Sequence, residues 1–413
     1  MKEGWELIDL GSVCHVQRGL TYSGKDTVDI SDQVVLRATN IDLGTGKLIF
    51  DELKYLREDL EIKPVYALKK DSLLICFSSG SKSHLGKIAL VDDDYPNFFF
   101  GGFIGQINPS EKIDSKYLFY CLSSETYKDY ISNLTDGVNI NNLKATDLKS
   151  FQIPLPPLPE QQRIVAILDE TFSAIDKAKA NAEQNLKNAK ELFESYLQGV
   201  FENGNNDWEV KCLDELGTIT SSKRIYKSEY VKEGVPFYRT KEIKELSNGN
   251  PITLELFISR DRYEQIKKSF GVPQIGDLLM SAVGTIGEIM VIENEDEFYF
   301  KDGNIVWFKD FQRLDTNYLK YALTAFVEKI KSLAIGSAYS ALTIEKLNKY
   351  EIAFPKTKEE QQTIVRQLDA LRAETQKLEA VYQKKIADLE ELKKSILQKA
   401  FAGELKTEKA VAV

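Results

Sequence analysis

The chain contains one long segment twice, and this internal repeat constrains the fold more than any other feature. The segment Trp5-Glu6-Leu7 recurs as Trp208-Glu209-Val210, and Glu160-Gln161-Gln162 recurs as Glu360-Gln361-Gln362. Further matches in the same order are Leu36-Arg37 with Tyr238-Arg239, Asp71 with Asp277, Gly86 with Gly287, and Asp114 with Asp315. A repeat of roughly two hundred residues predicts two copies of one fold. The two copies agree well in their last quarter and poorly in their first three quarters. This difference indicates a shared frame with separately varied surfaces.

The first part of each copy, residues 1–153 and 207–353, predicts a mixed α/β globule. Short β-branched and aromatic runs that are interrupted by Gly and Asp indicate strands. These runs are Val34–Arg37, Ser72–Phe77, Lys87–Val91 and Asn97–Phe100 in the first copy, and Asp277–Ser281 and Asn304–Phe308 in the second. Apolar residues at helical spacing predict a helix over Ser115–Asn133 and a counterpart over Thr316–Leu333.

The second part of each copy predicts a long helix. The proline-rich joint Pro154–Pro159 is expected to be stiff and close to polyproline II, and Glu160–Phe201 after it contains no proline. Apolar residues follow in steps of three and four, at Ile164, Leu168, Phe172, Ile175, Ala178, Ala182, Leu186, Ala189, Phe193, Tyr196 and Val200. The counterpart Glu359–Phe401 places Ile364, Leu368, Leu371, Leu378, Tyr382, Leu389, Leu392 and Ile396 at the same spacing. This spacing is typical of a coiled-coil seam, on a helix about 60 Å long.

Connectivity then predicts the arrangement of the four parts. Only Glu202–Asp207 separates the first long helix from the second globule, and antiparallel pairing of the two helices would bury both apolar seams. We therefore predict an α+β protein in which two long antiparallel coiled-coil helices separate two pseudo-symmetric mixed α/β globules. The expected parts are a first globule at 1–153, a joint and helix at 154–206, a second globule at 207–353, and a helix and tail at 354–413.

The sequence lacks the motifs that would indicate catalysis. No GxxxxGK[ST] phosphate loop occurs, and Leu155 precedes the only Pro-Pro pair, so the Asn/Asp-Pro-Pro-aromatic box of an amino-methyltransferase is missing. The segment Phe100–Gly105 resembles a glycine-rich cofactor loop. It follows an aromatic run and precedes no strong helix signal, which makes nucleotide binding the weaker interpretation. We expect no catalytic residue.

Metal binding and membrane insertion are not expected either. The cysteines Cys14, Cys76, Cys121 and Cys212 lack paired ligand spacing, so buried thiols are the favoured interpretation. The only histidines are His15 and His84, which argues against a zinc hydrolase or a Ser-His-Asp enzyme. No stretch approaches ~18 apolar residues, and the N-terminus has no core typical of a signal peptide, so we expect a cytoplasmic protein.

The loops of the globules have the composition expected for nucleic-acid binding. Three loops, Gln17–Lys25, Ser78–Lys87 and Gly137–Lys144, combine Gly, Ser or Asn with Lys or Arg. Amide and guanidinium groups can read base edges, while Ser, Lys and backbone N–H groups hold phosphates. A net charge of −9 excludes a uniformly basic surface but permits such local clusters. A structural scaffold remains an alternative, although it does not explain two separately varied globules, and a self-sufficient DNA methyltransferase is a further one.

Three segments carry a specific resemblance. Ile153–Asp169 begins Ile-Pro-Leu-Pro-Pro-Leu-Pro-Glu-Gln-Gln-Arg-Ile-Val, Phe354–Val365 repeats its Glu-Gln-Gln core, and Ser395–Leu405 ends the second helix. Together they resemble the specificity (S) subunit of type I restriction-modification systems, over essentially the whole chain. The second joint departs from the pattern, because Lys356-Thr357-Lys358 replaces its prolines, which makes that end less rigid.

The resemblance implies a non-catalytic subunit that recognises double-stranded DNA. Two target-recognition domains would each read one half of a split sequence, and the conserved helices would act as a ruler between them. Two modification subunits would attach around the helices and carry S-adenosylmethionine, while this chain would bind no cofactor and no metal. Whether restriction subunits also join the complex depends on other chains.

Loop position and side-chain chemistry select the candidate residues. The DNA-binding candidates are Arg18, Lys25, Arg37, Asn40, Lys82, Lys87, Asn139, Asn141 and Lys144 in the first globule, and Lys223, Arg224, Lys227, Arg239, Lys241, Ser337 and Tyr339 in the second. The partner-docking candidates are Glu160, Gln161, Gln162, Glu360, Gln361 and Gln362. An alternative for these glutamines is that their amides bind their own globule and fix the direction in which the helix leaves it.

Overall fold

The computed structural model describes residues 2–135, 142–202, 204, 207–333 and 342–405, which form two compact units. Unit 1 contains the chain up to Ala182 and again from Lys384, whereas unit 2 is the continuous segment Glu183–Gln383. Each unit therefore consists of one globular head and half of each long helix. We refer to the described part of residues 2–155 as head 1 and of residues 207–354 as head 2.

Head 1 contains three small sheets. Their strands are β1 Glu6–Asp9, β2 Cys14–Arg18, β3 Thr27–Val28, β4 Gln33–Leu36, β5 Lys54–Leu56, β6 Leu73–Cys76, β7 Ile88–Leu90, β8 Phe98–Phe100, β9 Ile104–Pro109 and β10 Gln152–Leu155. The strand orders are β2-β9-β6-β7, β3-β5-β4-β8 and β1-β10. Strand β6 is apolar and buried at all four positions, as expected for a strand that is covered on both faces.

Head 2 repeats this topology. Its strands are β11 Glu209–Cys212, β12 Thr218–Thr220, β13 Tyr230–Val231, β14 Val235–Tyr238, β15 Phe257–Ile258, β16 Leu278–Ser281, β17 Ile289–Val291, β18 Tyr299–Phe300, β19 Ile305–Lys309 and β20 Glu351–Phe354. The orders β12-β19-β16-β17, β13-β15-β14-β18 and β11-β20 match those of head 1 strand for strand. The internal repeat and the mixed α/β globules that the sequence predicted are thus confirmed.

The helices of the heads differ from expectation at one place. Head 1 contains α1 Ser115–Cys121, α2 Glu125–Thr135 and α3 Ala145–Lys149, and head 2 contains α5 Leu213–Leu216, α6 Thr240–Ser247, α7 Arg260–Ser269, α8 Thr316–Leu333 and α9 Ile344–Asn348. The single helix predicted over Ser115–Asn133 is wrong, because two helices form there. The Ser124 hydroxyl donates to the Cys121 carbonyl at 2.7 Å and accepts from the Tyr127 amide at 3.4 Å, which caps a new helix. Its counterpart α8 is continuous, as predicted.

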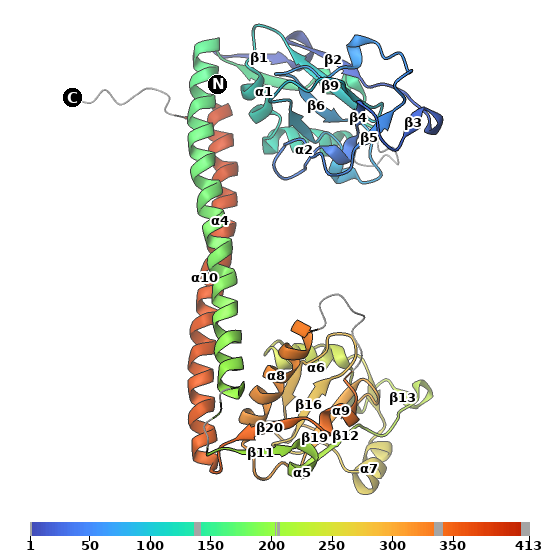
Figure 1. The fold of residues 1–413 in the computed structure, drawn as a ribbon, viewed down its shortest axis with the longest axis vertical. Helices are drawn as coiled ribbons and strands as arrows, with labels where there is room; N and C mark the ends of the chain where they lie inside the picture. The colour runs from blue at the N-terminus through green and yellow to red at the C-terminus, as the bar shows by residue number, and fades with distance from the viewer. Residues whose placement is uncertain (1, 136–141, 203, 205–206, 334–341, 406–413) are drawn as a thin grey trace, which may run out of the picture. The chain divides into compact units, whose positions relative to one another are not determined.

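Within each unit the two long helices run side by side in opposite directions (Figure 1). In unit 1, Lys179 pairs with Glu390 at 2.7 Å, and Asp176 pairs with Lys393 at 3.0 Å. Residue numbers therefore fall along one helix as they rise along the other, which makes the pairing antiparallel, as predicted. The helices are α4 Leu158–Glu202 and α10 Lys358–Ala402, each of 45 residues.

The predicted seam is buried or half-buried, with three exceptions. Tyr196, Leu378 and Leu392 are exposed, whereas Leu197 and Thr375 are buried. A strict seam predicts contact with one helix only, but each helix also packs on its head. In unit 2, for example, Leu197 lies in a cluster with Phe193, Leu368 and Ala325 of head 2. Packing on the head thus buries a wider stripe of the helix than the pairing of the two long helices alone would.

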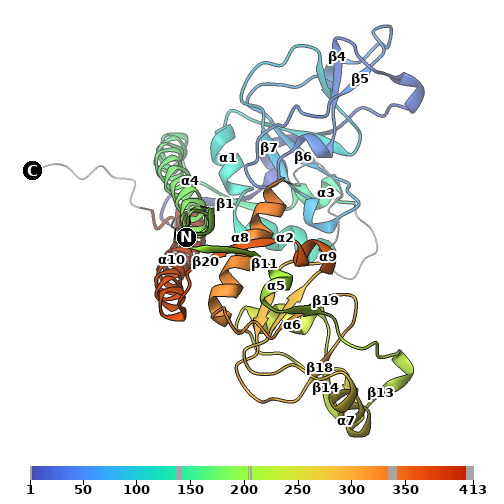
Figure 2. The same cartoon turned by 60° about the horizontal axis from the view of Figure 1, so that its bottom comes forward.

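Tyrosines of the heads fix the long helices in place. The Tyr117 hydroxyl donates to the Pro154 carbonyl at 2.8 Å, and the Tyr120 hydroxyl donates to Asp169 of α4. In unit 2, Tyr318 and Tyr321 make the same two contacts, to the Ala353 carbonyl and to Asp369 of α10. Figure 2 shows α1 and α8 in the same role, each between its long helix and the sheets of its own head.

Strand β10 and helix α4 take up the two ends of the proline-rich joint, where the sequence predicted polyproline II. Pro154 lies in β10 and pairs with Leu7 of β1 in an antiparallel register. A two-stranded sheet has only edge strands, which tolerate a proline without an N–H donor. Pro159 lies in the first turn of α4, where the missing donor costs no helical hydrogen bond.

Candidate nucleic-acid interface

In head 1 the ends of several strands converge on one group of loops. Strand β2 ends at Arg18, which pairs with Gly105 of β9, and strand β6 ends at Cys76, which pairs with Ile104. Because these neighbouring strands are antiparallel, the end of β2, the end of β6 and the start of β9 lie at the same edge of the sheet. The loops that follow, including Ser78–Gly80, are therefore brought together. We refer to this edge, which carries the candidate residues, as the recognition edge of head 1.

Arg18 is an exposed cation held in one place at this edge. Its Nη2 atom donates to the Leu143 carbonyl at 2.9 Å, and its guanidinium lies 4.9 Å from the centre of the Phe77 ring. The exposed Lys144 follows Leu143 directly. Two of the predicted residues thus lie close together, and their positions suit phosphate binding.

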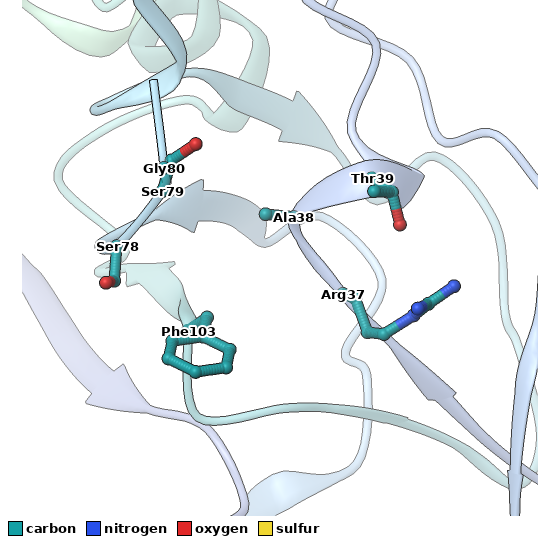
Figure 3. A pocket seen from close by; sticks show the side chains of 7 residues that line it. All are labelled: Arg37, Ala38, Thr39, Ser78, Ser79, Gly80 and Phe103. Carbon is teal, nitrogen blue, oxygen red and sulfur yellow. The ribbon is translucent and has the colours of Figure 1, made fainter. Parts of the chain in front are cut away.

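Arg37 lines a cavity of about 360 Å³ at the same edge. Its Nη2 atom donates to the Glu52 carbonyl at 3.0 Å, and among the described residues nothing accepts a hydrogen bond from its buried Nε. The cavity is also lined by Ala38, Thr39, Ser78, Ser79, Gly80 and Phe103. Figure 3 shows Phe103 and Ser78 on one side and Ala38 and Arg37 on the other, with the guanidinium directed away from the Phe103 ring.

Two predicted DNA-binding residues of head 1 have hydrogen-bond partners within the fold. The Asn40 side chain is buried, accepts from the Arg37 amide at 2.9 Å and donates to the Ile49 carbonyl at 3.0 Å. Lys87 turns inward and donates to the Ile41 carbonyl at 2.9 Å, and burial lowers its pKa. The buried Asn40 is therefore corrected to a structural role, whereas DNA contact by the half-buried Lys87 stays a prediction.

The other predictions for the loops divide into two groups. Lys25 and Lys82 are exposed on short 3₁₀ turns, at Gly24–Asp26 and Lys82–His84, where they are accessible to a polyanion. The candidates Asn139, Asn141, Ser337 and Tyr339 lie outside the described residues.

Head 2 has the same recognition edge with different chemistry. The Ser221 hydroxyl donates to the Ile305 carbonyl at 2.9 Å, and the Arg224 side chain pairs with Asp302 at 2.7 Å. The Lys223 ammonium lies 4.7 Å from the centre of the Phe270 ring. Here a smaller cavity of about 200 Å³ is lined by Thr218, Thr220, Ser221, Ser222, Lys223, Phe270, Tyr299 and Lys309. The exposed Lys227 lies on the adjoining turn Lys227–Glu229.

Carboxylates compensate two predicted cations of head 2. Arg239 pairs with Glu242 at 2.6 Å and with Glu255 at 2.7 Å, while Lys241 also pairs with Glu255. Hydrogen bonds from Lys241 and Arg239 lower the pKa of Glu255 to about 2. Arg37, the counterpart of Arg239, binds the Glu52 backbone carbonyl instead of a carboxylate. The equivalent arginines therefore present different net charge at the two edges.

The six docking candidates do not lie on one exposed surface. Gln161 is fully buried, where it accepts from the Asp114 amide at 2.9 Å and donates to the Lys112 and Pro156 carbonyls. Gln361 is buried in the same way in unit 2. These two residues are corrected to the structural alternative, since neither offers its amide to a partner. Glu160 is half-buried and pairs with Lys2 at 2.9 Å, whereas Gln162, Glu360 and Gln362 are exposed.

The cysteines and the long helices add no second kind of site within the described ranges. Cys14, Cys76 and Cys121 are buried as predicted, and burial raises the pKa of Cys121 to about 12, but Cys212 is half-exposed. In the described part of the chain, no three His, Cys, Asp or Glu side chains are placed to share a metal ion. Among the described helices, none combines the length and apolar character needed to span a bilayer.

Exposed aromatic residues at these edges were not among the sites predicted from the sequence. Phe103 and Phe270 both line the cavities and are both more than half exposed. Phe103 lies in Phe100–Gly105, where the glycines suggested a cofactor loop. The available signal was a bulky aromatic residue directly after a Gly-Gly pair between two strands, where a core residue is not expected.

The chain belongs to a known family of DNA-specificity proteins. Residues 2–187 and 205–388 each match the family described as the type I restriction modification DNA specificity domain. Specificity subunits are the DNA-recognition components of type I restriction-modification systems and are distinct from their methyltransferase subunits. This chain is accordingly a non-catalytic DNA-specificity subunit, as the sequence predicted.

Individual relatives support this assignment over nearly the full length. The specificity subunit of the type I restriction enzyme EcoKI from Escherichia coli (strain K12) is 26% identical, over 98% of this chain and 90% of its own. The StySPI specificity subunit from Salmonella potsdam gives the same identity and the same coverage.

Two solved structures share the fold. A chain from a structural study of assembly and conformational transition in the type I R-M system has a TM-score of 0.77 at 23% identity, over 98% of this chain and 99% of that one. The HsdS subunit from Thermoanaerobacter tengcongensis has a TM-score of 0.61 at 21% identity, over 98% of each chain.

Proposed function

We propose that head 1 and head 2 each read one half of a split double-stranded DNA target. The observation that carries this proposal is the pair of recognition edges, which share strand order and differ in side chains. Head 1 displays Arg18, Ser78 and Lys144, while head 2 displays Lys223 and Arg224 beside Asp302. A common frame with separately varied loops suits two readers of different sequences.

Within each head we assign cations to phosphates and other polar or aromatic groups to bases. Arg18 and Lys144 are exposed next to each other, and in head 2 Lys223 is exposed above Phe270. Phosphate contacts set register on the duplex but carry no sequence information themselves. The cavity at each edge then provides room for groups that discriminate base edges.

The long helices are proposed to set the spacing between the half-sites. Each helix has 45 residues, which corresponds to roughly 67 Å at ~1.5 Å per residue. Each also contributes to both compact units, because the unit boundaries fall at Ala182 in α4 and at Gln383 in α10. An uninterrupted helix is stiff, so its length can determine which spacer is accepted.

Two modification subunits are the proposed partners, with S-adenosylmethionine bound to them rather than to this chain. The exposed Gln162 in unit 1 and Glu360 and Gln362 in unit 2 lie at equivalent helix starts, so one partner surface could use both places. The complex would act in the cytoplasm, where it meets chromosomal DNA. This chain would supply specificity and its partners would transfer the methyl group.

The main test is methylation-sensitive sequencing of DNA from cells with and without this gene. A split, asymmetric methylated motif that disappears with the gene is the expected result. A scaffold would leave the methylated motifs unchanged. The purified chain with S-adenosylmethionine alone should not methylate DNA, and methylation under those conditions would contradict the proposed division of labour.

Exchange of one head provides a second test of the proposed modularity. Residues 1–153 can be replaced by the matching head of a relative, which leaves the second globule unchanged. The expected result is a motif with one new half and one original half. A folded chimaera that altered both halves would contradict independent reading by the two heads.

A further inference from the structure

The segment Phe100–Gly105 fixes the backbone of one exposed aromatic residue. The Phe103 carbonyl accepts hydrogen bonds from the Phe77 amide at 2.9 Å and from the Ser78 amide at 3.1 Å. The Ile104 amide donates to the Gly101 carbonyl at 2.9 Å, which closes the turn on its other side. The Phe103 side chain is nevertheless 69% exposed. The backbone is thus fixed while the ring is left uncovered.

Close strand packing explains the last glycine of the segment. A Cβ atom on Gly105 would lie 2.3 Å from the Phe77 ring and 2.7 Å from the Gln17 carbonyl oxygen. No real Cβ approaches backbone so closely, so a side chain there would push β9 away from β2. This glycine is therefore explained by the close packing of β9 on β2, and the interpretation as a cofactor loop has no support in the geometry.

Head 2 places a different side chain on the same backbone position. The Ala282 amide donates to the Asn304 carbonyl at 2.8 Å, as the Phe77 amide donates to that of Phe103. The strand registers agree, since Cys76 pairs with Ile104 and Ser281 pairs with Ile305. Phe103 and Asn304 are therefore equivalent. One shared frame carries an apolar ring in head 1 and an amide in head 2.

The surroundings of the ring are those of a base-reading position. Scattered exposed apolar residues are normal, so exposure alone carries no weight. Phe103, however, forms one wall of the cavity that Arg37 borders, and Arg18 packs on the Phe77 ring behind it. Both arginines are cations near this position and can hold phosphates of a strand whose base meets the ring.

From these observations we propose that Phe103 is a specificity-determining residue that contacts a thymine in the half-site of head 1. The proposal deepens the proposed function and rests on it. A phenyl ring cannot exchange hydrogen bonds with base edges, and the apolar group in the major groove is the thymine 5-methyl. Phe103 should therefore favour thymine at one position. At the equivalent position of head 2, Asn304 has the amide that can read adenine bidentately.

The test uses the complete complex with its modification subunits. Wild type, Phe103→Ala and Asn304→Ala are compared by the methylated motif and by binding to the cognate duplex. Phe103→Ala should relax one thymine position in one half-site and leave the other half unchanged. Asn304→Ala is the matched control and should affect only the other half. A melting temperature equal to wild type will show that the largely exposed ring was removed without unfolding head 1.

A deoxyuridine duplex then isolates the methyl group. With deoxyuridine in place of that thymine, wild type should bind roughly fourfold more weakly, the factor for one buried methyl. Phe103→Ala should already have lost this factor and should bind both duplexes equally. If Phe103→Ala and deoxyuridine each lower the affinity by an independent, additive factor, the proposed contact is overturned. Two groups in contact are coupled, so the effects of removing each of them do not add. An unchanged motif with folded Phe103→Ala would overturn it too, as would a loss of complex assembly instead of specificity. If wild type itself yields no split motif, the proposed function fails, which is a different outcome.

Discussion

Replacement of Gln161 by alanine should destabilise unit 1 strongly, although the residue lies at the start of an exposed helix. The side chain accepts from the Asp114 amide and donates to two carbonyls, those of Lys112 and Pro156. Alanine leaves all three backbone groups without this partner. A buried group without a partner costs about 1–3 kcal/mol, and water can reach part of this set, so we expect a loss of about 3 kcal/mol.

The assay must separate the two units, because a chain with two compact units need not unfold in one step. Urea unfolding meets this requirement when it is monitored by the hydrogen exchange of peptides from each unit. For a unit of this size, about 3 kcal/mol corresponds to a fall of roughly 6–12 °C in melting temperature. Exchange in unit 2 should stay close to wild type.

The neighbouring residue supplies the control. Gln162 is exposed, so Gln162→Ala should change stability by no more than ~0.5 kcal/mol. Gln361→Ala should reproduce the loss in unit 2, where Gln361 accepts from the Asp315 amide at 2.7 Å. If Gln161→Ala and Gln162→Ala unfold alike, the buried amide does not hold the helix start, and the reasoning is refuted.

Three further predictions follow from geometry and charge. Gly287→Ala should destabilise unit 2 by about 3 kcal/mol in urea unfolding, since its Cβ would lie 2.4 Å from Val327 at a positive φ. Gly284 has a similar φ but open space around it, so Gly284→Ala should cost only about 1 kcal/mol. Equal losses of stability in the two variants would contradict the clash. The carboxyl of Glu255 has a pKa lowered from 4.5 to about 2, so its contribution to stability is complete above pH 4.5 and is lost as the pH falls towards 2; a carboxyl NMR titration with a midpoint near 4.5 would contradict this. Matched insertions of seven residues after Ala182 and Gln383 should lengthen both helices by roughly 10 Å at ~1.5 Å per residue. At ~3.4 Å per base pair, the variant should favour a spacer about three base pairs longer. Methylation at the original spacing would contradict the proposal that the helices set the distance between the half-sites.

Much of the architecture could be predicted because the repeat provides each signal twice. Elements longer than a few turns, such as α4, α8 and α10, were found at nearly the correct bounds. The errors arose where one side chain changed the local structure. Ser124 capped a second helix within a continuous apolar pattern, and Pro154 entered an edge strand that sequence periodicity cannot reveal.

The recognition edge was harder to predict than the fold. Residue type alone suggested Asn40 and Lys87, but an amide or ammonium group serves a buried carbonyl as well as a base. Only the structure shows which polar side chains turn inward. Phe103 was missed for the opposite reason, since an aromatic residue is assigned to the core unless its exposure is known.

The division of the chain into units also determines the order in which they can be completed during synthesis. Unit 2 is continuous, so it can close as soon as Gln383 has left the ribosome. Head 1 is made first but still lacks part of its core, because Leu397, Ala400 and Phe401 pack into it, and the Phe401 ring lies 5.4 Å from that of Tyr117. A nascent chain must therefore keep this apolar surface of head 1 uncovered until the end of α10 has been made. A premature stop after Gln383 would accordingly harm the N-terminal head more than the domain next to the stop.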